Sequence, residues 1–175
     1  MTVAIIFETI EGHTGKIAKF VADHVRKSGQ EVTLIDTSDR TGQASFDGVD
    51  KVILAAPVHE RRHPKAFEVF VSASHQDLAA RPTLMISVSM SAAFPEGLDE
   101  AQEYLTEMEM RTRFSPTSEA LVAGAVKPGG YDYFQSQVVR HAVLGDRDYS
   151  LDEGEREFTD WDALAKQIDD FMNAA

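Results

Sequence analysis

The chain has 175 residues, no cysteine, and 17 basic against 29 acidic side chains, for a formal net charge of −12. This length suits one domain, residues 1–175, with a sizeable core. Without cysteine there are no disulfides, thiolate metal ligands or cysteine nucleophiles, and the negative charge argues against nucleic acid as a partner. No apolar run is long enough to cross a bilayer and the N-terminus lacks the basic start of a signal peptide, so we expect a cytoplasmic protein.

Apolar runs predict five strands, each leading to a helical pattern or a long connection. The expected strands are residues 3–7, 31–36, 52–56, 84–88 and 120–126. Helical spacing follows the first strand (17–25), the third (67–74) and the fourth (98–108). Thr159 is followed by Asp162 three residues later, a capping-box pattern that predicts the start of a last helix. This alternation predicts an α/β fold, a doubly wound five-stranded parallel sheet in the order 2-1-3-4-5, with ligands beyond the carboxyl ends of the strands.

The turn between the first strand and the first helix has the composition of a phosphate cradle, in the run Thr9-Ile10-Glu11-Gly12-His13-Thr14. Free N–H groups of a first helical turn, the helix dipole and threonine hydroxyls all favour an anion. The spacing matches neither the nucleotide P-loop nor the dinucleotide fingerprint, so we expect a mononucleotide phosphate, with Glu11 pointing away from it. The same residue types are also ordinary turn and N-cap residues, so this interpretation has a purely structural alternative.

The loop after the third strand, His59-Glu60-Arg61-Arg62-His63, matches the zinc-protease motif H-E-x-x-H. That motif needs a helix, whereas this segment lies between Pro57 and Pro64, and a residue before proline is disfavoured in the helical region. We therefore expect a strand-to-helix loop and no metal site. Arg61 and Arg62 are either solvated or paired with a carboxylate-bearing substrate.

The residues required for two other functions are absent from this sequence. A phosphoacceptor receiver domain needs an aspartate at the end of the third strand, where this chain has Ala55-Ala56-Pro57. A serine hydrolase needs a G-x-S-x-G turn, which is absent around Ser87, Ser89 and Ser91. These serines are better explained as turn residues or as hydrogen-bond donors to a ligand.

An extra segment, about residues 127–157, separates the fifth strand from the last helix, where a minimal fold needs only a few residues. Residues 127–130 predict a turn, and the spacing of Tyr131, Phe134, Val138 and Ala142 predicts a short helix that is either functional or covers the edge of the core. Residues 148–162 carry seven carboxylates and one arginine, which form either a solvated face or a docking surface for a basic redox partner.

Short motifs are distributed over nearly the whole chain: Phe7-Glu8-Thr9, Gly12, Thr14, Ile17-Ala18, Val52-Ile53, Ala55, Lys65-Ala66-Phe67, Ser87-Val88, Met90, Ala123-Gly124-Ala125 and Phe158-Thr159-Asp160-Trp161. This combination resembles the flavodoxin-type protoporphyrinogen oxidase family (menaquinone-dependent protoporphyrinogen IX dehydrogenase). The resemblance implies non-covalent FMN, oxidation of protoporphyrinogen IX to protoporphyrin IX, and a respiratory quinone as electron acceptor. A flavin supplies such redox chemistry without a side-chain nucleophile.

Carried over by position, the resemblance implies two groups of FMN-binding residues. The phosphate would lie against Thr9, Ile10, Glu11, Gly12, His13 and Thr14. The isoalloxazine ring would be bordered by residues 57–63, among them Pro57, Val58 and His59, and by Ser87, Val88, Ser89 and Met90. Catalysis would centre on the flavin, and the candidates near the ring are His59, Arg61 and Arg62.

The chain departs from this family in two places. Family members have an aromatic residue in the loop after the third strand, where this chain has residues 58–63, so that His59 or His63 either stacks on the ring or faces solvent. The extra segment is also less basic than in the family, where it suits peripheral contact with the inner face of the membrane.

Two alternatives therefore stay open. One is a soluble FMN electron-carrier flavodoxin that docks onto redox partners through its acidic face, and the other is a flavodoxin-fold interaction domain that has lost FMN. The substrate is then a porphyrinogen or another reduced small molecule, and the acceptor is a quinone or a redox protein. The sequence leaves the oligomeric state open.

Overall fold

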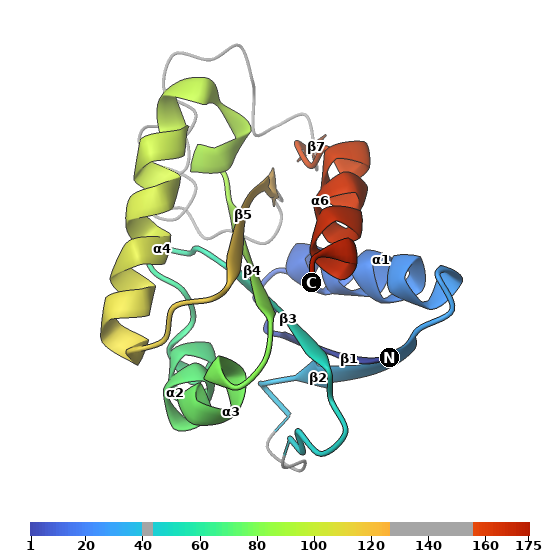
Figure 1. Cartoon of the computed structure of the whole chain (residues 1–175). Helices are drawn as coiled ribbons and strands as arrows, with labels where there is room; N and C mark the ends of the chain where they lie inside the picture. Colours follow the sequence, from blue (N-terminus) through green and yellow to red (C-terminus); the bar gives the residue numbers. More distant parts are fainter. Residues whose placement is uncertain (40–43, 127–155) are drawn as a thin grey trace.

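The computed structural model describes residues 1–39, 44–126 and 156–175 of the chain. Five parallel strands form one sheet in the order β2-β1-β3-β4-β5 (Figure 1). Their bounds are β1 Thr2–Phe7, β2 Glu31–Asp36, β3 Lys51–Pro57, β4 Thr83–Ser89 and β5 Ser118–Ala123. The predicted fold class and strand order are confirmed.

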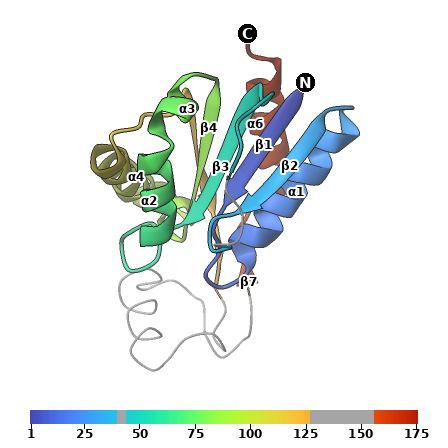
Figure 2. The same cartoon turned by 90° about the horizontal axis from the view of Figure 1, so that it is seen from below.

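Helices cover both faces of the sheet, as Figure 2 shows. One face carries α1 (His13–Lys27) and α6 (Trp161–Asn173), and the other carries α2 (Lys65–Ala73), α3 (His75–Ala79) and α4 (Leu98–Thr112). Two short 3₁₀ helices, η1 (Ser91–Ala93) and η2 (Pro95–Gly97), lead from β4 into α4. Within the described part of the chain, no helix combines the length and the hydropathy that crossing a bilayer requires.

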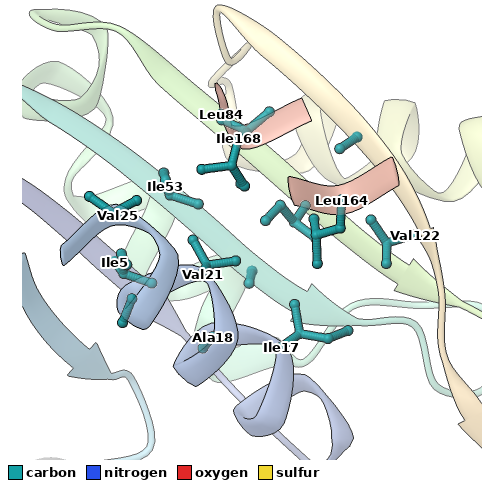
Figure 3. Packing of buried hydrophobic residues seen from close by; sticks show 14 of the residues in the cluster. Ile5, Ile17, Ala18, Val21, Val25, Ile53, Leu84, Val122, Leu164 and Ile168 are labelled. Atoms are coloured by element: carbon teal, nitrogen blue, oxygen red, sulfur yellow. The ribbon is translucent and has the colours of Figure 1, made fainter. Parts of the chain in front are cut away.

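Side chains that alternate along each strand divide the core into two clusters. On the α1 and α6 face, one cluster of buried residues includes Ile5 of β1, Ile17 of α1 and Ile168 of α6 (Figure 3). On the opposite face, Ile6 packs with Phe67 of α2 and with the apolar side of α4. Because β3 and β4 are covered on both faces, almost every residue in them is buried, which explains their continuous apolar sequences.

The predicted fifth strand is too long. β5 ends at Ala123, and after Gly124 the chain forms β6 (Ala125–Val126), which pairs antiparallel with β7 (Arg156–Glu157). Both Ala123 and Val126 are buried, so the apolar pattern continues across the point where the chain changes its pairing partner. β6 and β7 bracket the extra segment after β5. Residues 127–155, with the helix expected around Tyr131 and most of the acidic run, lie outside the described residues.

A buried lysine holds the C-terminal end of α6 against the sheet. Lys51 opens β3, and its Nζ donates to the carbonyl oxygens of Phe171, Met172 and Ala174 at 2.9, 3.1 and 2.7 Å. The last carbonyls of a helix have no partners within the helix, and an ammonium group has three donors. The contact therefore satisfies both the buried charge and the helix end.

Candidate functional site

Three loops meet at the carboxyl ends of β1, β3 and β4, where a doubly wound sheet binds ligands. Contacts between the loops show that they form one surface. The Glu11 carboxylate of the first loop lies 3.9 Å from Nδ1 of His59 in the second. The second loop reaches the third through the Val58 N–H, which donates to the Val88 carbonyl at 2.7 Å.

The first loop forms a tight turn into α1. Gly12 is the N-cap of α1, and its φ of 95° lies in the left-handed region that favours glycine. Thr9 closes the turn, since its Oγ1 accepts from the Gly12 N–H at 3.0 Å. Helix geometry leaves the N–H groups of residues 13–15 without intrahelical acceptors, and the first turn of α1 contains no acidic residue. Thr14 is buried in the same turn.

Glu11 and Ile10 differ in exposure. The Glu11 side chain keeps 22% of its accessible surface, and its carboxylate lies near His59 of the second loop. Ile10 is half-exposed.

His13, the first residue of α1, turns its side chain toward α6. Its Nε2 lies 2.7 Å from the Thr159 hydroxyl, and its ring meets Trp161 edge-on with the centroids 6.0 Å apart. Thr159 in turn donates to the Ala123 carbonyl at 2.6 Å. The sequence predicted Thr159 as the N-cap of α6, and this is wrong. The N-cap is Asp160, whose Oδ1 accepts from the Ala163 N–H at 3.0 Å.

The second loop is a tight turn, not a helix. His59 and Arg62 exchange two backbone hydrogen bonds, and the intervening Glu60 and Arg61 have φ values of 49° and 66°. This geometry confirms that the H-E-x-x-H sequence does not form the metalloprotease helix. Among the described residues no cluster of three metal-binding side chains is present.

His63 is buried at 1% exposure, with Nε2 2.8 Å from Ser87 Oγ, so the solvent-facing alternative is wrong for this residue. Burial lowers the pKa of His63 to about 4; the charge of Glu68 opposes this shift and that of Arg111 adds to it. The imidazole is therefore neutral near pH 7.

The two arginines of the second loop are paired with acids of the neighbouring helices. Arg61 contacts Glu100 of α4 at 3.1 Å, and Arg62 contacts Glu68 of α2 at 2.8 Å. Arg111 of α4 adds a forked contact to the same Glu68. Burial alone would raise the pKa of Glu68, but the hydrogen bonds from Arg111 and Arg62 outweigh it and hold that pKa below its usual value.

The third loop follows β4 and is fixed by β5. The Ser89 carbonyl accepts from the Gly124 N–H at 3.1 Å, and Ser89 Oγ accepts from the Ala92 N–H at 3.2 Å. A Cβ at Gly124 would lie 3.3 Å from Val88 Cγ1, so this glycine allows the close approach. Beside it, a cavity of about 220 Å³ lies between η1, β5 and the start of α6, and its lining includes Ala93, Ala123, Phe158 and Gln167.

The residues that the sequence predicts for a single site, Thr9–Thr14, Pro57–His59 and Ser87–Met90, lie at the same end of the sheet. Their role in binding stays a prediction. Sequence reasoning did not identify three residues that shape this site, namely Glu68, Gly124 and the hydroxyl of Thr159. Each acts through a partner far away in the chain. The sequence signal for Gly124 was the Ala-Gly-Ala run, and the signal for Thr159 was the Thr-Asp-Trp run.

Comparisons with known proteins agree with this architecture. The flavodoxin domain profile matches residues 4–150. Protoporphyrinogen IX dehydrogenase (quinone) of Escherichia coli strain K12 is 25% identical over 169 residues, 94% of this chain and 91% of that protein. The protein of the same name from Leishmania major is 24% identical over 172 residues, 95% of this chain and 73% of that protein.

Two solved structures share the fold. Oxidised Flavodoxin 1 from Bacillus cereus has a TM-score of 0.59 at 16% identity, covering 100% of this chain and 99% of that one. The Fusobacterium nucleatum flavodoxin bound to flavin mononucleotide has a TM-score of 0.52 at 13% identity, covering 98% and 94%. Because the domain profile spans most of the sequence, this chain belongs to the flavodoxin domain family.

Proposed function

We propose that this chain is an FMN-dependent oxidoreductase that oxidises protoporphyrinogen IX, or a related reduced tetrapyrrole, and passes the electrons to a quinone or another acceptor. The observation that carries the proposal is the turn at residues 9–14. It combines a left-handed Gly12, a bonded Thr9 hydroxyl and a helix start without acids. The names of the E. coli and L. major relatives supply the substrate and the acceptor.

The described residues fit both the phosphate end and the ring end of FMN. The N–H groups of residues 13–15 and the Thr14 hydroxyl would bind the phosphate. Gly12 allows this turn, because its positive φ would strain a residue with a side chain. Pro57, Val58 and His59 would border one side of the isoalloxazine ring, and residues 87–90 the other. FMN, when bound, supplies the acceptance and onward transfer of electrons.

The arginines of the second loop are the candidates for contact with a substrate carboxylate. The Arg61 side chain is 72% exposed, and its pairing with Glu100 is a surface contact of the kind that contributes little to stability. Arg61 would exchange this partner for a propionate group of a porphyrinogen. Glu68 holds Arg62 more firmly, because it is buried and bound by two guanidinium groups.

A soluble electron carrier is the second candidate. The fold shared with flavodoxins and the net charge of −12 favour it, because an acidic surface suits docking to a basic redox partner. A carrier would bind FMN in the same site but would not oxidise a porphyrinogen. In the first proposal the protein is cytoplasmic and contacts the inner face of the membrane, because the name of the E. coli relative includes a quinone.

The first test is a titration of the purified protein with FMN, followed by flavin fluorescence. We expect saturable quenching by the wild type and about tenfold weaker binding by Thr14→Val, which removes one buried hydroxyl contact to a charged group. Thr106→Val, on the exposed side of α4, is the matched control and should bind as the wild type does. Absence of binding by the wild type would contradict the proposal.

A further inference from the structure

The first turn of α1 has no side-chain cap of its own. Its N-cap is Gly12, which has no side chain, and the end of a helix frays unless its backbone groups are held. Two residues of this turn instead reach across to the chain that enters α6. His13 binds Thr159, and Lys16 binds Glu157 and lies over the Trp161 ring.

The direction of the His13 contact follows from the partners of Thr159. A threonine hydroxyl has one hydrogen, and Thr159 donates it to the Ala123 carbonyl, which can only accept. The Thr159 oxygen must therefore accept from His13, so Nε2 of His13 carries a hydrogen. The imidazole is 7% exposed, and burial of a polar ring is costly unless it is hydrogen-bonded, which makes this contact a strong restraint.

We infer that His13 is a positioning residue for phosphate binding. Through Thr159 it fixes the first turn of α1 to the end of β5, in the orientation in which the N–H groups of residues 13–15 point at the phosphate. This role differs from direct contact of the His13 ring with phosphate, since Nε2–H is already donated to Thr159. The inference rests on the proposed binding of FMN.

A comparison of FMN with riboflavin tests it, because riboflavin has the same ring but no phosphate. The dissociation constants of both flavins are measured by fluorescence quenching for the wild type, Thr159→Val, Thr159→Ser and His13→Phe. We expect Thr159→Val and His13→Phe to bind FMN about tenfold more weakly and riboflavin as the wild type does. Thr159→Ser keeps the hydroxyl and should restore tight FMN binding, and Thr106→Val on α4 controls for the loss of a hydroxyl elsewhere.

The outcomes separate the inference from the proposed function. If the wild type binds FMN no more tightly than riboflavin, the phosphate site itself is wrong and the inference falls with it. If the wild type prefers FMN but Thr159→Val keeps that preference, or loses affinity for both flavins equally, only the positioning role is overturned. Failure of Thr159→Ser to rescue binding overturns it as well.

A second measurement needs no flavin. Long-range ¹H–¹⁵N spectra of the histidine side chains report which ring nitrogen carries hydrogen. We expect hydrogen on Nε2 of His13 in the wild type and a changed Nε2 signal in Thr159→Val. A neutral ring with hydrogen only on Nδ1 would overturn the inference, because His13 then cannot donate to Thr159.

Discussion

His63 and Ser87 join the loop after β3 to the end of β4, with His63 Nε2 2.8 Å from Ser87 Oγ and both side chains buried. His63 lies in the loop after β3 and Ser87 lies in β4, beside the proposed ring site. Because burial lowers the pKa of His63 to about 4, the contact is made by a neutral imidazole under physiological conditions. Protonation of His63 would place an unsolvated charge between this loop and β4.

We predict that the free energy of unfolding falls as the pH drops below about 6.5. Below this pH the unfolded chain binds a proton at His63, whereas the folded protein binds it only near pH 4. The decrease in the free energy of unfolding that is due to His63 is about 2 kcal/mol between about pH 8 and about pH 5. Urea denaturation at both pH values measures it. His63→Gln should lack this decrease. His75→Gln, at an exposed position of α3, should show the pH dependence of the wild type. Identical pH dependence in all three proteins would show that His63 is not the group responsible.

The Lys51 contact with the end of α6 predicts a large loss of stability on substitution. Lys51→Met should lower the free energy of unfolding by about 2 kcal/mol or more, because three carbonyl groups lose a charged donor inside the protein. Lys19→Met is the control, since Lys19 is exposed and forms an ion pair with Asp23 on the surface of α1. Its effect should stay within about 0.5 kcal/mol. Equal effects of the two substitutions would show that Lys51 does not anchor α6.

Glu109 of α4 lies beside Glu119 of β5, and this pair predicts that stability falls as the pH rises from the ordinary carboxyl pKa toward about 8. Burial, together with the hydrogen bond and charge of Glu119, raises the pKa of Glu109 to about 8. The folded state therefore holds a proton that the unfolded chain releases near the ordinary carboxyl pKa, and the resulting stabilisation is lost as the pH rises toward about 8. Glu109→Gln should be more stable than the wild type above that pH, whereas Glu103→Gln on the exposed side of α4 should not. Thermal unfolding at several pH values checks this, and a destabilised Glu109→Gln above that pH would contradict it.

Gly12, the N-cap of α1, and Gly15, inside its first turn, should respond in opposite ways to substitution by alanine. Gly12→Ala forces a side chain into the left-handed region and should destabilise the fold by about 1 to 2 kcal/mol and weaken FMN binding. Gly15→Ala places a Cβ inside α1 at ordinary contact distance, 3.5 Å from Thr9 Cγ2, and should stabilise the helix by about 0.5 to 1 kcal/mol. Denaturation of both variants measures the contrast. Stabilisation by Gly12→Ala would show that its backbone conformation is not required.

The fold was predictable from the sequence where local patterns decide it. Strands buried on both faces have continuous apolar runs, and β3 and β4 were recognised by these runs. The pattern failed at the end of β5, because Val126 stays buried although it pairs with a different strand. The start of α6 was misplaced by one residue, since Thr159 and Asp160 are both good N-cap residues and a tertiary contact with Ala123 decides between them.

The site was predictable to the extent that it depends on turn chemistry. Pro57 and Pro64 correctly indicated a loop at residues 58–63, and Gly12 marked the turn at the start of α1. The partners of Arg61 and Arg62 lie on α2 and α4, and no local pattern specifies such pairs. The burial of His63 against Ser87 also depends on strand register. The assignment of these residues to FMN remains a prediction.

The most direct test of the oxidoreductase proposal mixes the FMN-loaded protein with protoporphyrinogen IX in the absence of oxygen and any other acceptor. The visible absorption of oxidised FMN and the fluorescence of porphyrin are recorded together. We expect the FMN absorption to bleach in the absence of an acceptor. Because oxidation of one porphyrinogen to porphyrin releases six electrons and the flavin accepts only two at a time, we expect porphyrin fluorescence to rise only after excess quinone is added and reoxidises the flavin repeatedly. Flavin that stays oxidised in the presence of porphyrinogen, although FMN is bound, would contradict the oxidoreductase proposal and leave an electron carrier as the function.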